Sequence, residues 1–187
     1  GQLVELALGH AERFKARRGA EPLRILDLGT GSGAIACAIA WTRRMAHVTG
    51  VDISAEAVAV AEQNARQLDL DNLRFVTGSW TEPVRELRYP VVVSNPPYVA
   101  AGDEALAALR YEPQTALVAP GDDLSCIREL AVRVPAVLEE GGVFLFEHGS
   151  DQAERIADVL DEHGWTGIEN FRDYAGLPRV TRARRDS

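Results

Sequence analysis

The chain has 187 residues and a mass of 20.3 kDa, with 46% hydrophobic and 26% charged residues, the size and balance of one globular domain. Its net charge of −8 and pI near 5.0 argue against a domain that grips nucleic acid by its phosphates, so no direct nucleic-acid partner is expected. Neither a signal peptide nor an apolar run of about 20 residues is visible, which predicts a cytoplasmic protein without a membrane partner.

The first residues predict a leading helix. Apolar side chains recur at helical spacing over residues 1–18, and Gly19 follows as a stop signal. The chain begins with Gly1 rather than Met, which indicates a fragment or a trimmed form. The two cysteines, Cys37 and Cys126, fall in separate helical patterns without a neighbouring His, so we expect core thiols rather than a metal site or a disulfide.

A strand, a glycine-rich turn and a helix come next. Residues 23–28 form an apolar run that predicts a buried strand, and residues 34–41 continue as an apolar helix. Small residues between them let the backbone approach a ligand and leave N–H groups free to donate to it. The candidate ligand-binding residues of this turn are Gly29, Thr30, Gly31, Ser32 and Gly33. Their spacing also satisfies the relaxed dinucleotide fingerprint, so an NAD-binding interpretation stays open at this point.

The next two predicted strands each end in polar or aromatic residues. Residues 47–52 end in Asp52, about 20 residues past the glycines, where a carboxylate can accept from both ribose hydroxyls of a nucleoside. Ser54 is typical of a helix N-cap and precedes a helical pattern. Residues 73–77 predict a third strand, which leads to Ser79 and Trp80.

The fourth strand, over residues 91–94, leads into Asn95-Pro96-Pro97-Tyr98. Two prolines remove backbone donors, so the carbonyl of Pro96 is available to a ligand beside the Asn95 side-chain oxygen. Tyr98 adds a flat aromatic face. Two acceptors and a ring describe a clamp for a planar –NH2 group, which a glutamine, an adenine or a cytosine would each supply.

The remaining pattern predicts an α/β domain. We expect a helix over residues 124–140 with a kink or break near Pro135, a strand over 143–147, and a helix over 151–163 with Asp151 as N-cap. Two strands, 165–171 and 179–184, then follow with little helix between them, which predicts a mixed sheet whose last strand is antiparallel. With these strand ends placed, the chain resembles the class I S-adenosylmethionine-dependent methyltransferases. That resemblance implies a Rossmann-like, seven-stranded mixed sheet with helices on both faces.

A narrower resemblance, to the release factor glutamine methyltransferases, covers nearly the whole chain. It rests on motifs that occur in the family's order: Asp27 to Ile35, Asn95 to Tyr98, Tyr111-Glu112-Pro113 with Ala116-Leu117, Glu147-His148-Gly149, and Arg172-Asp173-x-Ala175-Gly176-x-x-Arg179. Such enzymes methylate the side-chain nitrogen of the glutamine in the Gly-Gly-Gln motif of class I peptide chain release factors. The resemblance implies S-adenosyl-L-methionine as cofactor, S-adenosyl-L-homocysteine as product, no metal, and a monomer.

The resemblance also implies residue roles and a domain boundary. It makes residues 1–187 the catalytic domain and leaves the family's N-terminal helical docking domain absent. It assigns catalysis to Asn95, Pro96 and Tyr98, and substrate binding to these three with Pro97. The implied cofactor-binding residues are Gly29, Thr30, Gly31, Ser32, Gly33, Asp52, Ile53, Ser79, Trp80 and Asn95.

Two departures from the family pattern are visible. Asp123 stands where the family usually has glycine, and Ser79 stands where it often has aspartate, which leaves adenine recognition resting more on Trp80. Glu147 and His148 invite a base or metal interpretation, but no second ligand cluster accompanies them, so we expect a supporting role. A methyltransferase for another planar amine and a non-catalytic nucleoside-binding module remain alternatives.

Overall fold

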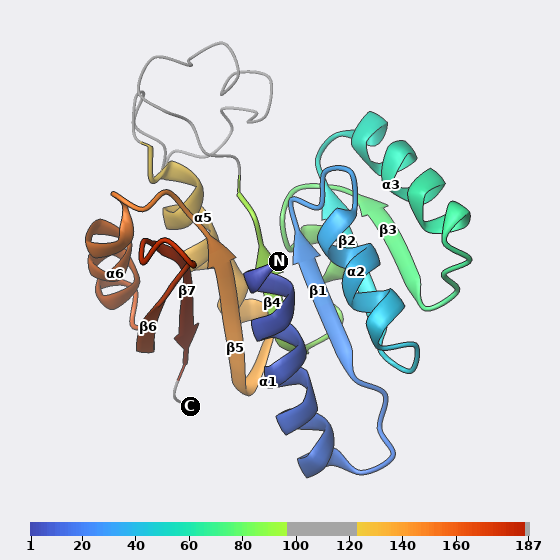
Figure 1. The fold of residues 1–187 in the computed structure, drawn as a ribbon, viewed down its shortest axis with the longest axis horizontal. Coiled ribbons are helices and arrows are strands. Elements are labelled where there is room, and N and C mark those ends of the chain that lie inside the picture. The colour runs from blue at the N-terminus through green and yellow to red at the C-terminus, as the bar shows by residue number, and fades with distance from the viewer. Residues whose placement is uncertain (97–122, 186–187) are drawn as a thin grey trace.

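The computed structural model describes residues 1–96 and 123–185, and alternates strands with helices along most of that length (Figure 1). Its helices are α1 (Gln2–Arg18), α2 (Ala34–Thr42), α3 (Ala55–Gln67), α5 (Ser125–Arg133) and α6 (Ala153–Glu162). Its strands are β1 (Arg24–Leu28), β2 (His47–Asp52), β3 (Leu73–Thr77), β4 (Tyr89–Ser94), β5 (Leu138–Glu147), β6 (Thr166–Arg172) and β7 (Pro178–Arg184). Short 3₁₀ helices occupy Glu82–Val84 and Val134–Ala136.

The seven strands form one mixed sheet in the order β3-β2-β1-β4-β5-β7-β6. β1 to β5 pair in parallel, whereas β7 runs antiparallel to both of its neighbours, so the predicted fold class is confirmed. The carboxyl ends of β1 to β5 therefore meet at one edge of the sheet. Because β7 runs the other way, its first residues lie at this same edge (Figure 1).

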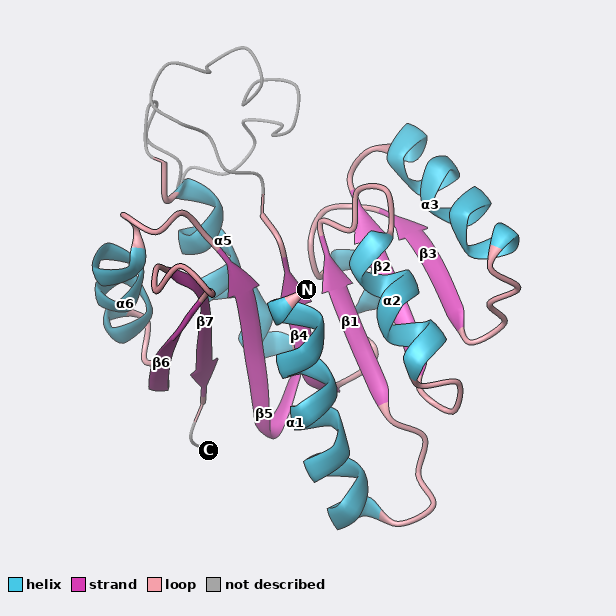
Figure 2. Ribbon diagram, viewed as in Figure 1, coloured by secondary structure: helices cyan, strands magenta, loops and turns pink. Residues whose placement is uncertain are grey.

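Helices cover both faces of the sheet, as Figure 2 shows. Alternate residues of the central strands point to opposite faces, and nearly all of them are apolar. Ile25, Val91 and Val93 pack with α1 and α2 on one face. Leu26 and Val92 pack with α5 and α6 on the other. Burial on both faces holds the strand ends, and the side chains that follow them, in fixed positions.

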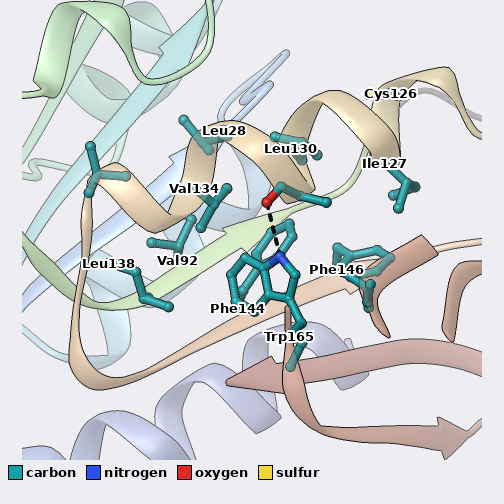
Figure 3. Close-up of a cluster of buried hydrophobic side chains, with 14 of the residues drawn as sticks. Leu28, Val92, Cys126, Ile127, Leu130, Val134, Leu138, Phe144, Phe146 and Trp165 are labelled. Atoms are coloured by element: carbon teal, nitrogen blue, oxygen red, sulfur yellow. Dashed lines mark hydrogen bonds between the residues drawn. The ribbon is translucent and has the colours of Figure 1, made fainter. Parts of the chain in front are cut away.

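The core on the α5 and α6 face is built around aromatic rings (Figure 3). Trp165 is fully buried and its ring centroid lies 5.6 Å from that of Phe144. Its indole N–H donates to the carbonyl of Ala131 at 3.0 Å, which satisfies the one polar atom of the ring. This bond ties α5 to the start of β6.

The segment around Pro135 agrees with the prediction only in part. A helix forms and breaks near Pro135 as expected, but the helix predicted to continue to residue 140 is wrong, because α5 ends at Arg133 and β5 already begins at Leu138. Proline lacks an N–H and its ring clashes with the preceding helical turn, so only a short 3₁₀ helix follows α5. Pairing of Leu138 with Tyr89 in β4 then draws the chain into the sheet.

Two further local predictions had different outcomes. Asp151 is not the N-cap of α6, since Gln152 occupies that position and the helix begins at Ala153. Ser54 caps α3 as predicted, accepting from the Ala57 N–H at 3.1 Å. Cys37 and Cys126 are buried core residues, as expected. In the described parts of the chain, no helix has the length and apolarity needed to cross a membrane.

Candidate active site

The glycine turn between β1 and α2 has a backbone that favours glycine. Gly29, Gly31 and Gly33 have φ angles of +70°, +56° and +78°, a region that side chains disfavour. A Cβ atom at Gly33 would lie 2.8 Å from the Phe75 ring, so this position is also filled from β3. At Gly31, by contrast, nothing lies within 4 Å of the position of a Cβ, so one side of the turn is open.

Asp52, at the end of β2, holds the glycine turn in place. Its Oδ2 accepts from the Gly31 N–H at 2.8 Å, and its Oδ1 accepts from the Ser54 N–H at 2.9 Å. The two bonds leave further lone pairs on a half-buried carboxylate. Asp52 is therefore both a brace for the turn and an available acceptor, while the next residue, Ile53, is exposed.

Asp27 is a buried carboxyl group directly behind the turn. Its Oδ2 accepts from the Thr30 hydroxyl at 2.7 Å, whereas its Oδ1 has no hydrogen-bond partner within the described residues. Burial raises the pKa of Asp27 from 3.8 to about 7, against the opposing Thr30 hydrogen bond and with a smaller contribution from Asp52. In the sequence, Asp27 begins a motif of the family resemblance, but it was not among the predicted site residues. The available signal was an acidic residue inside an apolar strand, two residues before Gly29.

Trp80 brings the end of β3 to the same place. Its residue has an uncommon φ of +45°, and its ring packs partly on the hydrophobic core. A Cβ at Gly29 would lie 3.5 Å from the Trp80 ring, so the ring borders the turn. Ser79 is half-buried beside it, and its carbonyl accepts from the Glu82 N–H at 3.0 Å. The ends of β1, β2 and β3 thus gather the predicted cofactor-binding residues at one edge.

Asn95 and Pro96 follow β4 and lie next in line along this edge. Just before them, the Ser94 hydroxyl donates to the Leu28 carbonyl at 2.7 Å, a buried bond that ties β4 to the start of the glycine turn. The Asn95 residue is exposed and Pro96 is buried. Pro97 and Tyr98, the other half of the predicted clamp, lie outside the described residues.

A cleft of ≈ 510 Å³ opens on the side of Asn95 away from β2 and β3. It is lined by residues that come from α1, the segment after β4, the end of β5 and the loop after it, the β6–β7 turn and the start of β7: Gln2, Asn95, Pro96, Glu147, His148, Gly149, Ser150, Asp151, Asp173 and Arg179. Asn95 therefore stands between the strand ends that carry the glycine turn and a cleft large enough for part of a second molecule. Sequence reasoning did not assemble this cleft.

Glu147 and His148 have different surroundings in the cleft. Burial raises the pKa of the half-buried Glu147 carboxyl. The His148 Nε2 lies 2.8 Å from the Thr181 hydroxyl, and its Nδ1 lies 2.9 Å from the Gly149 carbonyl. Burial lowers the pKa of His148. Both ring nitrogens are engaged in holding the loop, in agreement with a supporting role. Within residues 1–96 and 123–185, no group of three or more His, Cys, Asp or Glu residues is arranged to hold a metal.

Comparison with known proteins gives the family. A family model described as "Methyltransferase domain" matches residues 20–172. The chain is 47% identical over 162 residues to the release factor glutamine methyltransferase of Neisseria gonorrhoeae, covering 84% of this chain and 59% of that protein. It is 40% identical over 183 residues to the Vibrio cholerae protein of the same name, covering 96% and 62%. The chain thus spans about three-fifths of the length of these relatives.

Solved structures agree on the fold. The crystal structure of ribosomal protein L11 methylase from Lactobacillus delbrueckii subsp. bulgaricus aligns with a TM-score of 0.65 at 22% identity, covering 100% of this chain and 80% of that one. At 22% identity, this similarity shows a shared fold and nothing about function. The chain belongs to the methyltransferase domain family, and the resemblance to the release factor glutamine methyltransferases that its motifs predict is confirmed over most of its length.

Proposed function

We propose that the protein transfers a methyl group from S-adenosyl-L-methionine to the side-chain amide nitrogen of a glutamine in a class I peptide chain release factor. One observation carries the proposal: Asn95 stands at a strand end between the glycine turn and a separate cleft. A group-transfer enzyme needs such an arrangement, because donor and acceptor must approach one residue from two sides. The names of the relatives support the choice of acceptor.

The residues present fit S-adenosylmethionine. This cofactor has a charged amino-acid end, a ribose with two hydroxyls and a flat adenine. The orphaned Oδ1 of Asp27 is a buried acceptor that a cationic ligand group would satisfy. Asp52 retains lone pairs for ribose hydroxyls, and Trp80 offers an aromatic face beside the turn. When bound, the cofactor supplies an electrophilic methyl group on a sulfonium.

Asn95 and Pro96 would act on the acceptor nitrogen. An amide nitrogen is a poor nucleophile because its lone pair is delocalised into the carbonyl. Hydrogen bonds from its –NH2 to the Asn95 side-chain oxygen and the Pro96 carbonyl favour a pyramidal nitrogen whose lone pair is available for attack. The new N–C bond forms as the methyl–sulfur bond breaks, and the nitrogen then loses one proton to water. No strong base is needed, because an N-protonated amide is very acidic.

The charge of the cleft favours a polypeptide acceptor over a nucleic acid. Glu147, Asp151 and Asp173 line it, and Arg179 is paired with Asp173 at 3.1 Å. His148 adds no fixed charge at neutral pH, since burial lowers its pKa. An acidic rim repels a phosphate backbone, whereas a neutral protein loop meets no such barrier. A cytoplasmic location and a monomeric state stay predictions from the sequence.

The decisive experiment supplies the purified protein with S-adenosylmethionine and a class I release factor, and locates the methyl group by mass spectrometry. The expected product carries one methyl on the glutamine of the Gly-Gly-Gln motif. A release factor with that glutamine changed to alanine is the matched control and should gain none. Methylation of DNA or RNA with an unmodified release factor would refute the proposal. Preferential binding of NAD would refute the cofactor assignment.

A further inference from the structure

We propose that Glu147 and Arg179 form a clamp for the polypeptide backbone beside the acceptor glutamine. In this clamp, Glu147 accepts a hydrogen bond from a backbone N–H and Arg179 donates to a backbone carbonyl. The inference deepens the proposed function and rests on it. It assigns substrate contacts to two side chains on the far side of the cleft from the glycine turn.

The sheet register places Glu147 beside Asn95. Ser94 of β4 is paired with Phe146 of β5, so Asn95 and Glu147 are the next residues on two adjacent parallel strands. Neighbouring strands lie about 4.8 Å apart. The distance from the side-chain amide of a glutamine to its own backbone is similar to this strand spacing. An acceptor held at Asn95 therefore brings its backbone within reach of Glu147.

The Glu147 carboxylate is available for this contact. It lines the cleft, is half-buried, and takes part in no hydrogen bond or ion pair with the other described residues. Partial burial disfavours its charged form, which agrees with its raised pKa. A backbone N–H entering the cleft would return the hydrogen bond that burial removed.

Arg179 is held rigidly on the neighbouring strand β7, one residue before Val180, which is paired with Glu147. Its Nε donates to the Asp173 Oδ2 at 3.1 Å, and its own carbonyl accepts from the His148 N–H at 3.0 Å. Asp173 is fixed in turn, because its Oδ1 accepts from the N–H groups of Ala175 and Leu177 at 2.9 and 3.0 Å. Within the described residues, Nε is the only guanidinium atom of Arg179 in a hydrogen bond. Its terminal N–H groups remain for a ligand carbonyl.

One acceptor and one donor match the repeating unit of a polypeptide, which offers one N–H and one C=O per residue. Asp173 also keeps Arg179 from neutralising Glu147, because the arginine is paired elsewhere. Glycines beside the acceptor leave the backbone N–H groups unshielded by side chains. The clamp therefore selects a glycine-flanked glutamine in an extended loop over a free amide or a nucleobase.

The test compares Glu147→Ala and Glu147→Gln with Glu140→Ala, a matched control at the exposed start of the same strand. The substrate is an acetylated peptide containing Gly-Gly-Gln, with three versions in which one backbone N–H at a time is replaced by an ester oxygen. For wild type, we expect one ester peptide to lose about 10- to 100-fold in kcat/KM, the range for a hydrogen bond to a charged group. With the normal peptide, Glu147→Ala should show a similar loss in kcat/KM, mainly through a raised KM. With that ester peptide, the kcat/KM of Glu147→Ala should fall little further.

Further readouts separate a contact from a structural effect. Glu147→Gln keeps an acceptor oxygen and should retain more activity than Glu147→Ala, and Arg179→Gln should raise KM about 5- to 20-fold. Affinity for S-adenosylhomocysteine, measured by calorimetry, should be unchanged in all variants. Equal additional ester losses in wild type and Glu147→Ala would overturn this inference alone. Absence of any methylation by wild type, with intact release factor as well as peptide, would overturn the proposed function and the inference together.

Discussion

Replacing Asp27 with asparagine should make the protein more stable at neutral pH, and by an amount that grows with pH. The folded protein raises the pKa of Asp27 from 3.8 to about 7, because burial disfavours the carboxylate. Between these two values the folded state binds a proton that the unfolded state has lost. The contribution of this group to the free energy of unfolding is therefore complete below pH 3.8 and falls as the pH rises to 7.

The size of the effect follows from the pKa change. At 1.36 kcal/mol per pKa unit, the rise to about 7 corresponds to about 4 kcal/mol lost by pH 7. Asparagine mimics the protonated, neutral form, and its side-chain carbonyl still accepts from the Thr30 hydroxyl. The variant lacks this titration. The difference between its free energy of unfolding and that of wild type should therefore grow by about 2 kcal/mol from pH 5 to pH 7.

The assay is urea unfolding of both proteins at half-unit intervals from pH 5 to pH 7.5, without cofactor. All other ionisable groups are shared, so their contributions cancel in the difference between the two curves. Parallel curves would refute the raised pKa and the argument built on the unpartnered Oδ1. The same variant should bind S-adenosylmethionine more weakly, since it can no longer offer a carboxylate to a cationic ligand group.

Three other predictions address the turn, the clamp and the leading helix. Asn95→Ala should lower kcat by about 10²–10³-fold with a smaller change in cofactor affinity, whereas Asn95→Asp should keep partial activity. Near-native turnover by the alanine variant would show that the Asn95-Pro96 segment is only a turn and does not hold the acceptor –NH2 group. Asp52→Ala should weaken cofactor binding by about 1.5–3 kcal/mol in calorimetry, and unchanged affinity would remove Asp52 from the site. Burial, with smaller contributions from Arg182, Arg13 and Arg184, lowers the pKa of His10 from 6.5 to about 4. Stability should therefore fall as the pH drops through that range, and His10→Gln should lessen the fall in acid unfolding curves.

Local patterns were sufficient for the elements that surround the glycine turn. β1, α2, β2 and β3 appear within a residue or two of their predicted ranges, because strand and helix periodicities and glycine conformation act over a few neighbouring residues. The prediction failed after Pro135, where a helical pattern continues to residue 140 but β5 already begins at Leu138. There, pairing of Leu138 with a strand nearly 50 residues earlier outweighs the local preference, and no local pattern reveals that pairing.

The sequence by itself determined the succession of strands and helices along the chain, the glycine turn and the presence of an Asn-Pro motif at a strand end. Only the tertiary structure decided what these parts meet. It brought the Gly31 N–H into a hydrogen bond with Asp52, 21 residues away in the sequence. It buried the Asp27 Oδ1 without a hydrogen-bond partner among the described residues, and it placed Glu147 beside Asn95. The physical reason is that hydrogen-bond partners and burial depend on strand order. Adjacent strands in this sheet come from distant parts of the chain, so their meeting is a property of the topology.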